Sequence, residues 1–339
     1  SEGLKPSPPT DPVTLIRRVT FDLTGLPPTP EAVEEVLQDR RPDAYERYID
    51  ELLASPHFGE RMAVYWLDLV RYADTVGYHG DQDQNISPYR DYVIDAFNDD
   101  LPLDQFTREQ LAGDLFPEPT LSQQIATGYN RLLQTSHEGG VQPKEYLAIY
   151  AADRIRNLSN VWMGATVGCA QCHDHKYDPY TIHDFYSMVA FFADIDEQQH
   201  FKTGSNALPT RRDPEISVLA RWQRAQLKSI ESKLAELTQS AGNGDQIASL
   251  ESARDALKQS EQKTMVTRAI DPREIRVLPR GNWLDDSGPV VEPSIPIFLG
   301  RLETEGRRAT RLDLANWLVD PEDGVGGLTS RVFVNRFWY

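Results

Sequence analysis

Cys169-Ala170-Gln171-Cys172-His173 contains both cysteines of this 339-residue chain, three positions apart, with a histidine directly after the second. This spacing is typical of a c-type haem attachment site. Two thiols placed in this way can add to the two vinyl groups of a haem as thioethers, and the histidine can bind the iron. The pentapeptide therefore predicts one covalent haem c, held by Cys169 and Cys172, with His173 as the proximal iron ligand.

Other kinds of site use the same residue types. Thioredoxin-like redox centres also contain a Cys-x-x-Cys pair, but they need a strand–helix–strand setting that the flanking sequence does not resemble. Zinc could be bound by Cys169 and Cys172 with His175 or His183, although no second cysteine pair follows. A disulfide would close a very short loop, which gains little entropy and strains the bond. Haem is the preferred interpretation, and zinc and dithiol chemistry stay open.

The composition restricts the partners and the compartment. The formal net charge is −17, which argues against nucleic acid and anionic membranes and suits a basic redox partner protein. No apolar run reaches the 18 or so residues of a membrane span. Covalent haem is attached outside the cytoplasm, so we expect a periplasmic or otherwise exported protein whose leader is absent from this chain. Nothing in the sequence indicates an oligomeric state.

Helix signals recur along the chain and predict a mostly α fold. Asp11-Pro12 and Thr29-Pro30 are helix starts, and Gly25 is a helix end. A long helix begins at Pro143 and ends near Gly164, just before the cysteines. Thr181 and Asp184 have the spacing of a capping box. Further helices are predicted at 43–54, 56–73, 88–99, 103–114, 181–193, 306–319 and 328–338.

The middle of the chain has a different pattern. Leucines and isoleucines at steps of three and four over 227–237 and 247–257, on either side of a Gly-rich break, predict an antiparallel coiled-coil hairpin. Residues 265–305 are Pro-rich and alternate apolar with charged side chains, which indicates a connector with a few short strands. We therefore expect five segments: a lead-in at 1–10, a helical haem domain at 11–200, the hairpin at 201–264, the connector at 265–305 and the start of a truncated C-terminal helical domain at 306–339.

Several stretches resemble one known family, the planctomycete-type cytochrome c-like proteins, whose domains are mostly of unknown function. The matching stretches are Arg17–Pro30, Trp66–Asp68, Arg71–Asp74, Tyr89–Asp91, Glu109–Leu115, Glu138–Gly140 and Gly168–Pro179. They cover about residues 10–195. Leu278–Trp283 resembles the connector of the family, and Leu312–Tyr339 resembles the opening of its usual C-terminal partner domain. The resemblance implies haem binding but transfers no reaction.

The sixth iron ligand decides between two functions. A His or Met there favours electron transfer, whereas an open position permits a small molecule to bind. His79 and His137, in polar loops, are the candidate distal ligands, and Met163 could reach the iron only if the chain folds back. We expect an exported c-type cytochrome that transfers single electrons. The alternative is a haem-dependent oxidoreductase for a small molecule or carbohydrate, with Glu138, His137 or His79 as acid–base groups. A third interpretation is a structural scaffold without redox chemistry.

Overall fold

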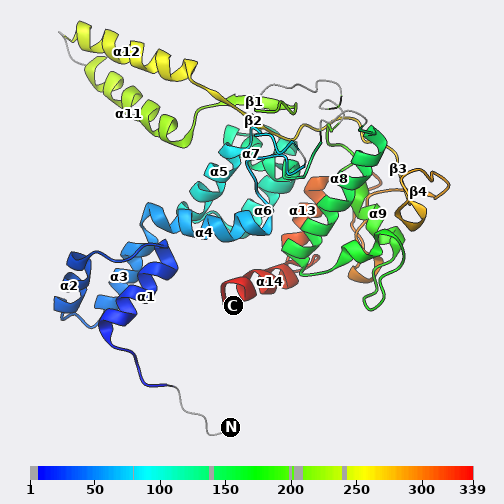
Figure 1. Ribbon diagram of the computed structural model, residues 1–339, viewed down its shortest axis with the longest axis horizontal. Helices are drawn as coiled ribbons and strands as arrows, with labels where there is room; N and C mark the ends of the chain where they lie inside the picture. The colour runs from blue at the N-terminus through cyan, green and yellow to red at the C-terminus, as the bar shows by residue number, and fades with distance from the viewer. Residues whose placement is uncertain are drawn as a thin grey trace. The chain divides into compact units, whose positions relative to one another are not determined.

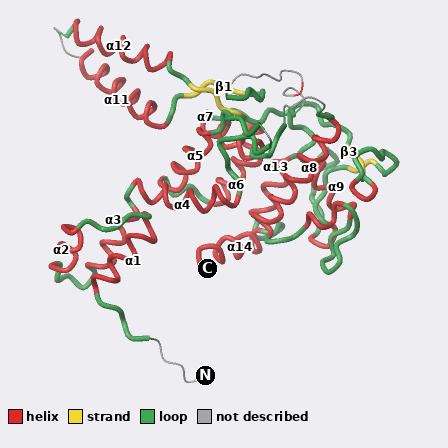
Figure 2. The backbone as a smooth tube through the Cα atoms, in the orientation of Figure 1, coloured by secondary structure: helices red, strands yellow, loops and turns green. Residues whose placement is uncertain are grey.

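The computed structural model describes residues 7–78, 80–136, 141–197, 201, 209–238 and 243–338. Helices dominate these residues, and strands are few and short (Figure 2), so the predicted mostly α fold is confirmed. The chain divides into two compact units, residues 1–68 with 93–101 and residues 69–92 with 102–339. The five predicted segments stay a prediction.

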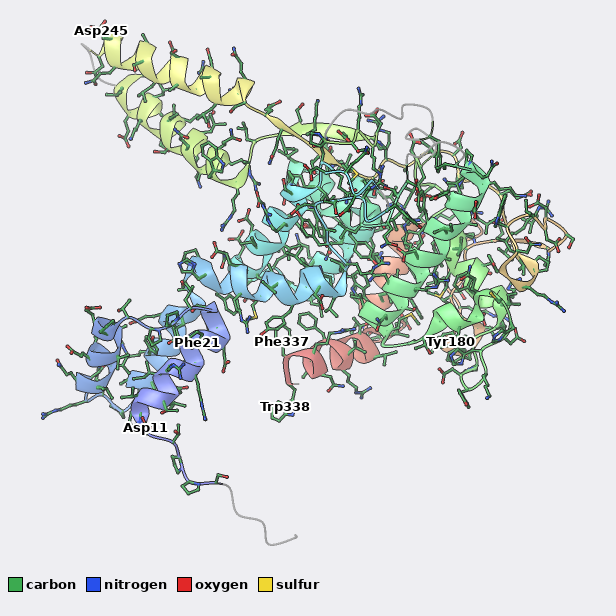
Figure 3. All side chains as sticks on the ribbon, viewed as in Figure 1. Asp11, Phe21, Tyr180, Asp245, Phe337 and Trp338 are labelled. Atoms are coloured by element: carbon green, nitrogen blue, oxygen red, sulfur yellow. The ribbon has the colours of Figure 1, made fainter. Side chains whose placement is uncertain are left out.

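The first unit is helical, and its helix ends follow local sequence signals. Its elements are α1 (Pro12–Thr24), α2 (Pro30–Gln38), α3 (Ala44–Leu53), most of α4 (Pro56–Leu69) and the second half of α5 (Ser87–Asn98). Asp11, labelled in Figure 3, caps α1 by accepting a backbone amide at 2.9 Å. Gly25 ends the helix with φ +72°, a conformation that glycine adopts without strain. Inside the unit, the buried hydroxyls of Thr20 and Tyr48 lie 2.8 Å apart.

The second unit contains the candidate site. Among the described residues, its α-helices other than the hairpin and the first half of α5 are α6 (Leu103–Ala112), α7 (Leu121–Ala126), α8 (Pro143–Leu158), α9 (Ile182–Ala190), α13 (Arg311–Val319) and α14 (Gly326–Trp338). A π-helical turn, Ser159–Met163, extends α8 toward the predicted end at Gly164. Thr310 and Asp313 form a capping box, so α13 begins at Arg311 rather than at residue 306. The short helix α7, which also has a capping box, was not predicted.

Two helices project together from a small β-ribbon (Figure 1). They are α11 (Arg221–Thr238) and α12 (Gly244–Gln259), and the antiparallel strands β1 (Glu215–Val218) and β2 (Gln262–Met265) bracket them. Ile230 and Leu257 are buried on the two helices. The predicted pair of helices is thus present, while its coiled-coil character stays a prediction.

The Pro-rich connector contains the predicted short strands. They are β3 (Ile275–Arg276) and β4 (Val290–Val291), which pair antiparallel beside α9 (Figure 1). The loop between these strands begins and ends next to α9, because both strands contact that helix. Among the described residues, no helix combines the length and the apolar character that crossing a bilayer requires.

Candidate functional site

The Cys-x-x-Cys segment begins on a short 3₁₀ helix, Val167–Gln171, which packs against α8 and α9 and has Cys172 as its C-cap residue. Side chains three residues apart share one face of such a helix. Val167 and Ala170 are fully buried and anchor the inner face. Cys169 and Cys172, also three residues apart, are exposed and form no disulfide. Cys169 lies on the 3₁₀ helix and Cys172 is its C-cap residue, so both free thiols belong to one short turn.

His173 follows directly and has one ring nitrogen engaged. Its Nδ1 lies 2.7 Å from the Asp174 carbonyl oxygen, which can only accept, so Nδ1 carries the proton. In the neutral imidazole the lone pair is then on Nε2. A metal-binding histidine usually donates its second ring N–H to a carbonyl or carboxylate in this way. The exposed ring of His173 has the tautomer that a ligand through Nε2 needs.

His175 has the opposite tautomer and a structural role. Its Nδ1 accepts the backbone amides of Tyr177 (3.2 Å) and Asp178 (2.9 Å), and its Nε2 lies 3.1 Å from the Thr166 hydroxyl. The side chain is only 6% exposed. Its backbone amide also donates to the carbonyl of Tyr180, labelled in Figure 3, at 2.8 Å. Both ring nitrogens are occupied, so His175 organises the loop after the motif.

A cavity of about 580 Å³ reaches the motif at Gln171, whereas Cys169, Cys172 and His173 do not line it. Its size is within the range of cofactor and small-molecule sites. One wall is apolar and comes from α8 and α9. On α8 the small alanine side chains leave room for the cavity. The residues of this wall are Leu147, Ala148, Ala151, Ala152, Phe185, Tyr186 and Val189. The opposite wall comes from the connector and contains Arg273, Glu274, Ile275, Arg276, Leu278, Trp283 and Asp286. Lys144 and Gln171 complete the lining.

Tyr186 joins the cavity to the motif. Its hydroxyl donates to the Gln171 carbonyl at 3.1 Å. Burial and the neighbouring Cys172 thiol raise the pKa of Tyr186 to about 12, so the phenol stays protonated and remains a donor at neutral pH. Gln171 is also held from its side chain by Arg156 of α8. These contacts fix the turn between the two cysteines.

The other predicted ligands lie elsewhere or are not described. His79, His137 and Glu138 are outside the described residues. Met163 is buried in the π-helical turn. On α9, Phe185 lines the cavity and Met188 is buried without lining it. Phe191 and Phe192, just after the helix, are also buried and do not line it.

The zinc interpretation finds little support in these contacts. His183 lies 3.4 Å from the Ser187 hydroxyl and lines a separate cavity, and His175 has no free nitrogen. In the part of the chain that the structure describes, no three His, Cys, Asp or Glu side chains gather in a metal-binding group.

The sequence around this site matches a known family. Residues 1–197 match PSCyt2, described as a protein of unknown function (DUF1549). The chain belongs to this family. The PSCyt2 match includes the Cys-x-x-Cys-His segment, α8 and α9, but it ends before the connector wall of the cavity. No curated protein and no solved structure matches the chain.

Sequence reasoning missed the connector residues of the cavity. Arg273 and Trp283 are about a hundred positions from the cysteines, and nothing in their local pattern indicates a site. The available signal was the expected resemblance of Leu278–Trp283 to a family connector, but no role was assigned to that segment.

Proposed function

We propose that the chain is an exported c-type cytochrome with one covalently attached haem and that it transfers single electrons. The observation that carries the proposal is one short turn that contains two free, exposed thiols and is followed directly by His173, whose Nε2 lone pair is available. Cys169 and Cys172 would hold the haem by thioethers, and His173 would be its proximal ligand.

The cavity has an apolar wall and charged groups, and it reaches the motif at Gln171. If a haem attached at the motif extended into it, α8 and α9 would exclude water from the porphyrin, and Lys144 and Arg276 would pair with its carboxylates. Arg273 is already held by Glu197 at 3.1 Å and by the Ile195 carbonyl at 2.9 Å. Lys144 and Arg276 are paired with Asp286 and Glu274, but exposed pairs of this kind contribute little and can be exchanged. When bound, the haem supplies a one-electron Fe(III)/Fe(II) couple.

One observation favours the alternative function, that of a haem-dependent enzyme. None of the described residues lining the cavity is His or Met, the usual strong sixth ligands. The sixth ligand would then be His79 or His137, or the position would be open, as a haem-dependent oxidoreductase for a small molecule or carbohydrate requires. In that case Glu138, His137 and His79 are the candidate acid–base groups.

The test is an absorption spectrum and an intact mass of the protein produced with a cytochrome c maturation system. We expect a covalent haem, with the mass of one haem added to the chain, and its loss in the Cys169→Ala/Cys172→Ala variant. A colourless protein with the bare polypeptide mass would refute the proposal and support the scaffold interpretation. Carbon monoxide separates the two functions, because rapid formation of a new complex indicates an open site and no change indicates two protein ligands.

A further inference from the structure

The wall of the cavity near Arg273 carries a positive charge that its own contacts do not balance. Glu197 is buried behind this wall and accepts from two guanidinium groups, those of Arg154 and Arg273. One carboxylate shared by two arginines leaves an excess of one positive charge in this cluster. Arg273 lines the cavity, whereas Glu197 and Arg154 do not. The excess charge is therefore available to a ligand only from the side of the cavity.

The more enclosed polar side chains of the lining offer donors rather than acceptors. The side-chain oxygen of Gln171 accepts from Arg156, which can only donate, so its amide nitrogen is the end without a partner. Among the described residues, the indole N–H of Trp283 has no acceptor either. The lining carboxylates, Glu274 and Asp286, are 58% and 61% exposed and each is already paired with a cation. A ligand inside the cavity must therefore bring its own acceptors.

We propose that the cavity binds a small organic acid, with an apolar body and one carboxylate. Its volume of about 580 Å³ suits such a molecule, and the apolar side chains of α8 and α9 would cover the body. The carboxylate would balance the charge of Arg273 and accept from the N–H groups of Trp283 or Gln171. This inference goes beyond the proposed function and does not rest on it, because neither the cysteines nor the histidine of the motif line the cavity.

The first test compares probes of similar shape and different charge by isothermal titration calorimetry on the full chain. Naphthoate carries a carboxylate, naphthylmethanol is neutral and naphthylmethylamine is a cation. We expect saturable binding of naphthoate at one site per chain. The alcohol should bind weaker by about tenfold or more, since hydrogen bonds to a charged group contribute more than neutral ones. Equal affinity for the three probes, or no saturable binding of naphthoate, would overturn the inference.

The second test places the ligand with a matched pair of substitutions on α8. Ala151 lines the cavity, whereas Ile149 is 37% exposed and does not. The indole of Ala151→Trp should fill the space and abolish naphthoate binding, and Ile149→Trp should bind as the wild type does. Naphthoate binding that survives Ala151→Trp, or that Ile149→Trp removes equally, would place the ligand elsewhere and refute the inference.

The third test removes the groups that would recognise the carboxylate. Arg273→Gln leaves Glu197 paired with Arg154 and should weaken naphthoate binding by about tenfold, with no change for naphthylmethanol. Arg301→Gln, which removes the same charge from a different cavity, is the control and should keep the wild-type affinity. Trp283→Phe keeps an aromatic ring without the N–H and should give a smaller loss, again for naphthoate alone.

Circular dichroism shows which variants are folded, and Trp283→Phe carries the third test if Arg273→Gln does not fold. Wild-type affinity for naphthoate in every folded variant of the lining would contradict the assignment of the carboxylate. The outcome is separable from that of the proposed function. A chain that never acquires haem and still binds naphthoate supports this inference alone. A haem-loaded chain that no longer binds naphthoate would mean that the haem fills the cavity, which overturns this inference and leaves the proposed function standing.

Discussion

At the scale of single residues, two histidines two positions apart have different hydrogen-bond partners, which select different tautomers. His173 donates from Nδ1 and leaves Nε2 free, whereas His175 uses both nitrogens to hold the loop. The roles of these side chains therefore follow from backbone geometry rather than from residue type. Their substitutions should consequently have separable effects.

We expect His173→Ala to change the haem spectrum and His175→Ala to change the stability. His173 is exposed and its ring is hydrogen-bonded to the adjacent Asp174 carbonyl, so under the proposed function its loss should remove the proximal ligand while the thioethers retain haem. Removing His175 leaves the Tyr177 and Asp178 amides without their acceptor and should cost about 1–3 kcal/mol. Absorption spectra and urea unfolding of both variants measure the two effects. A wild-type spectrum for His173→Ala would contradict its assignment.

The sequence predicts the site residues that are adjacent in the chain, but not those that only the folded structure brings together. Cys169, Cys172 and His173 are adjacent, so their spacing can be recognised without the fold. The role of His175 depends on amides that meet its ring only once the loop has closed. Gly281 reaches Cys172 across more than a hundred residues, and no local pattern encodes that contact.

At the scale of elements, helix starts were predictable wherever the capping side chain is close in sequence. Asp11 and Thr29 cap α1 and α2, as expected. The β-ribbon under the helical hairpin was not predicted, because the pairing of Glu215 with Met265 joins segments fifty residues apart. The start of α13 offers a quantitative test of capping.

Asp313 should make α13 sensitive to acid. The Arg307 guanidinium, 2.6 Å away, and the Thr310 groups lower the pKa of Asp313 from 3.8 to about 2. Because the folded value is depressed, the stabilisation is complete above about pH 4 and is lost as the pH falls toward 2. After allowance for solvent screening it is about 1 kcal/mol. Asp313→Asn should therefore be less stable than wild type by this amount at pH 6 and equally stable near pH 2.

Urea unfolding at several pH values measures this difference. Arg307→Ala serves as the comparison, because it removes the same ion pair from the other side and should give the same pH dependence. The double variant should then lose little more than either single variant. A difference that stays constant from pH 6 to pH 2 would show that Asp313 acts only as a neutral cap.

At the scale of the whole molecule, buried charge links segments that the sequence leaves unconnected. Arg311 is fully buried and donates to Asp114 and Asp194, which are 197 and 117 residues away in the chain. Polarity alone would place such an arginine at the surface. Buried cations need these partners, since an unpaired charge in the core is strongly destabilising. Tertiary ion pairs of this kind are the part of the fold that periodicity does not predict.

The net charge of −17 leads to a prediction about the electron partner. A field of one sign accelerates encounter with an oppositely charged protein, and salt screens it over a Debye length of about 10 Å at 0.1 M. If the chain is an electron carrier, its reaction with a basic redox protein should slow by roughly tenfold or more between low and physiological ionic strength. Stopped-flow absorbance at the haem band measures the rate. A neutral small-molecule reductant is the control and should show almost no salt dependence. If the rate with the basic protein stays constant or rises with salt, the acidic surface does not steer this partner. The docking face near Cys169 and Cys172 would then have a different charge from the molecule as a whole.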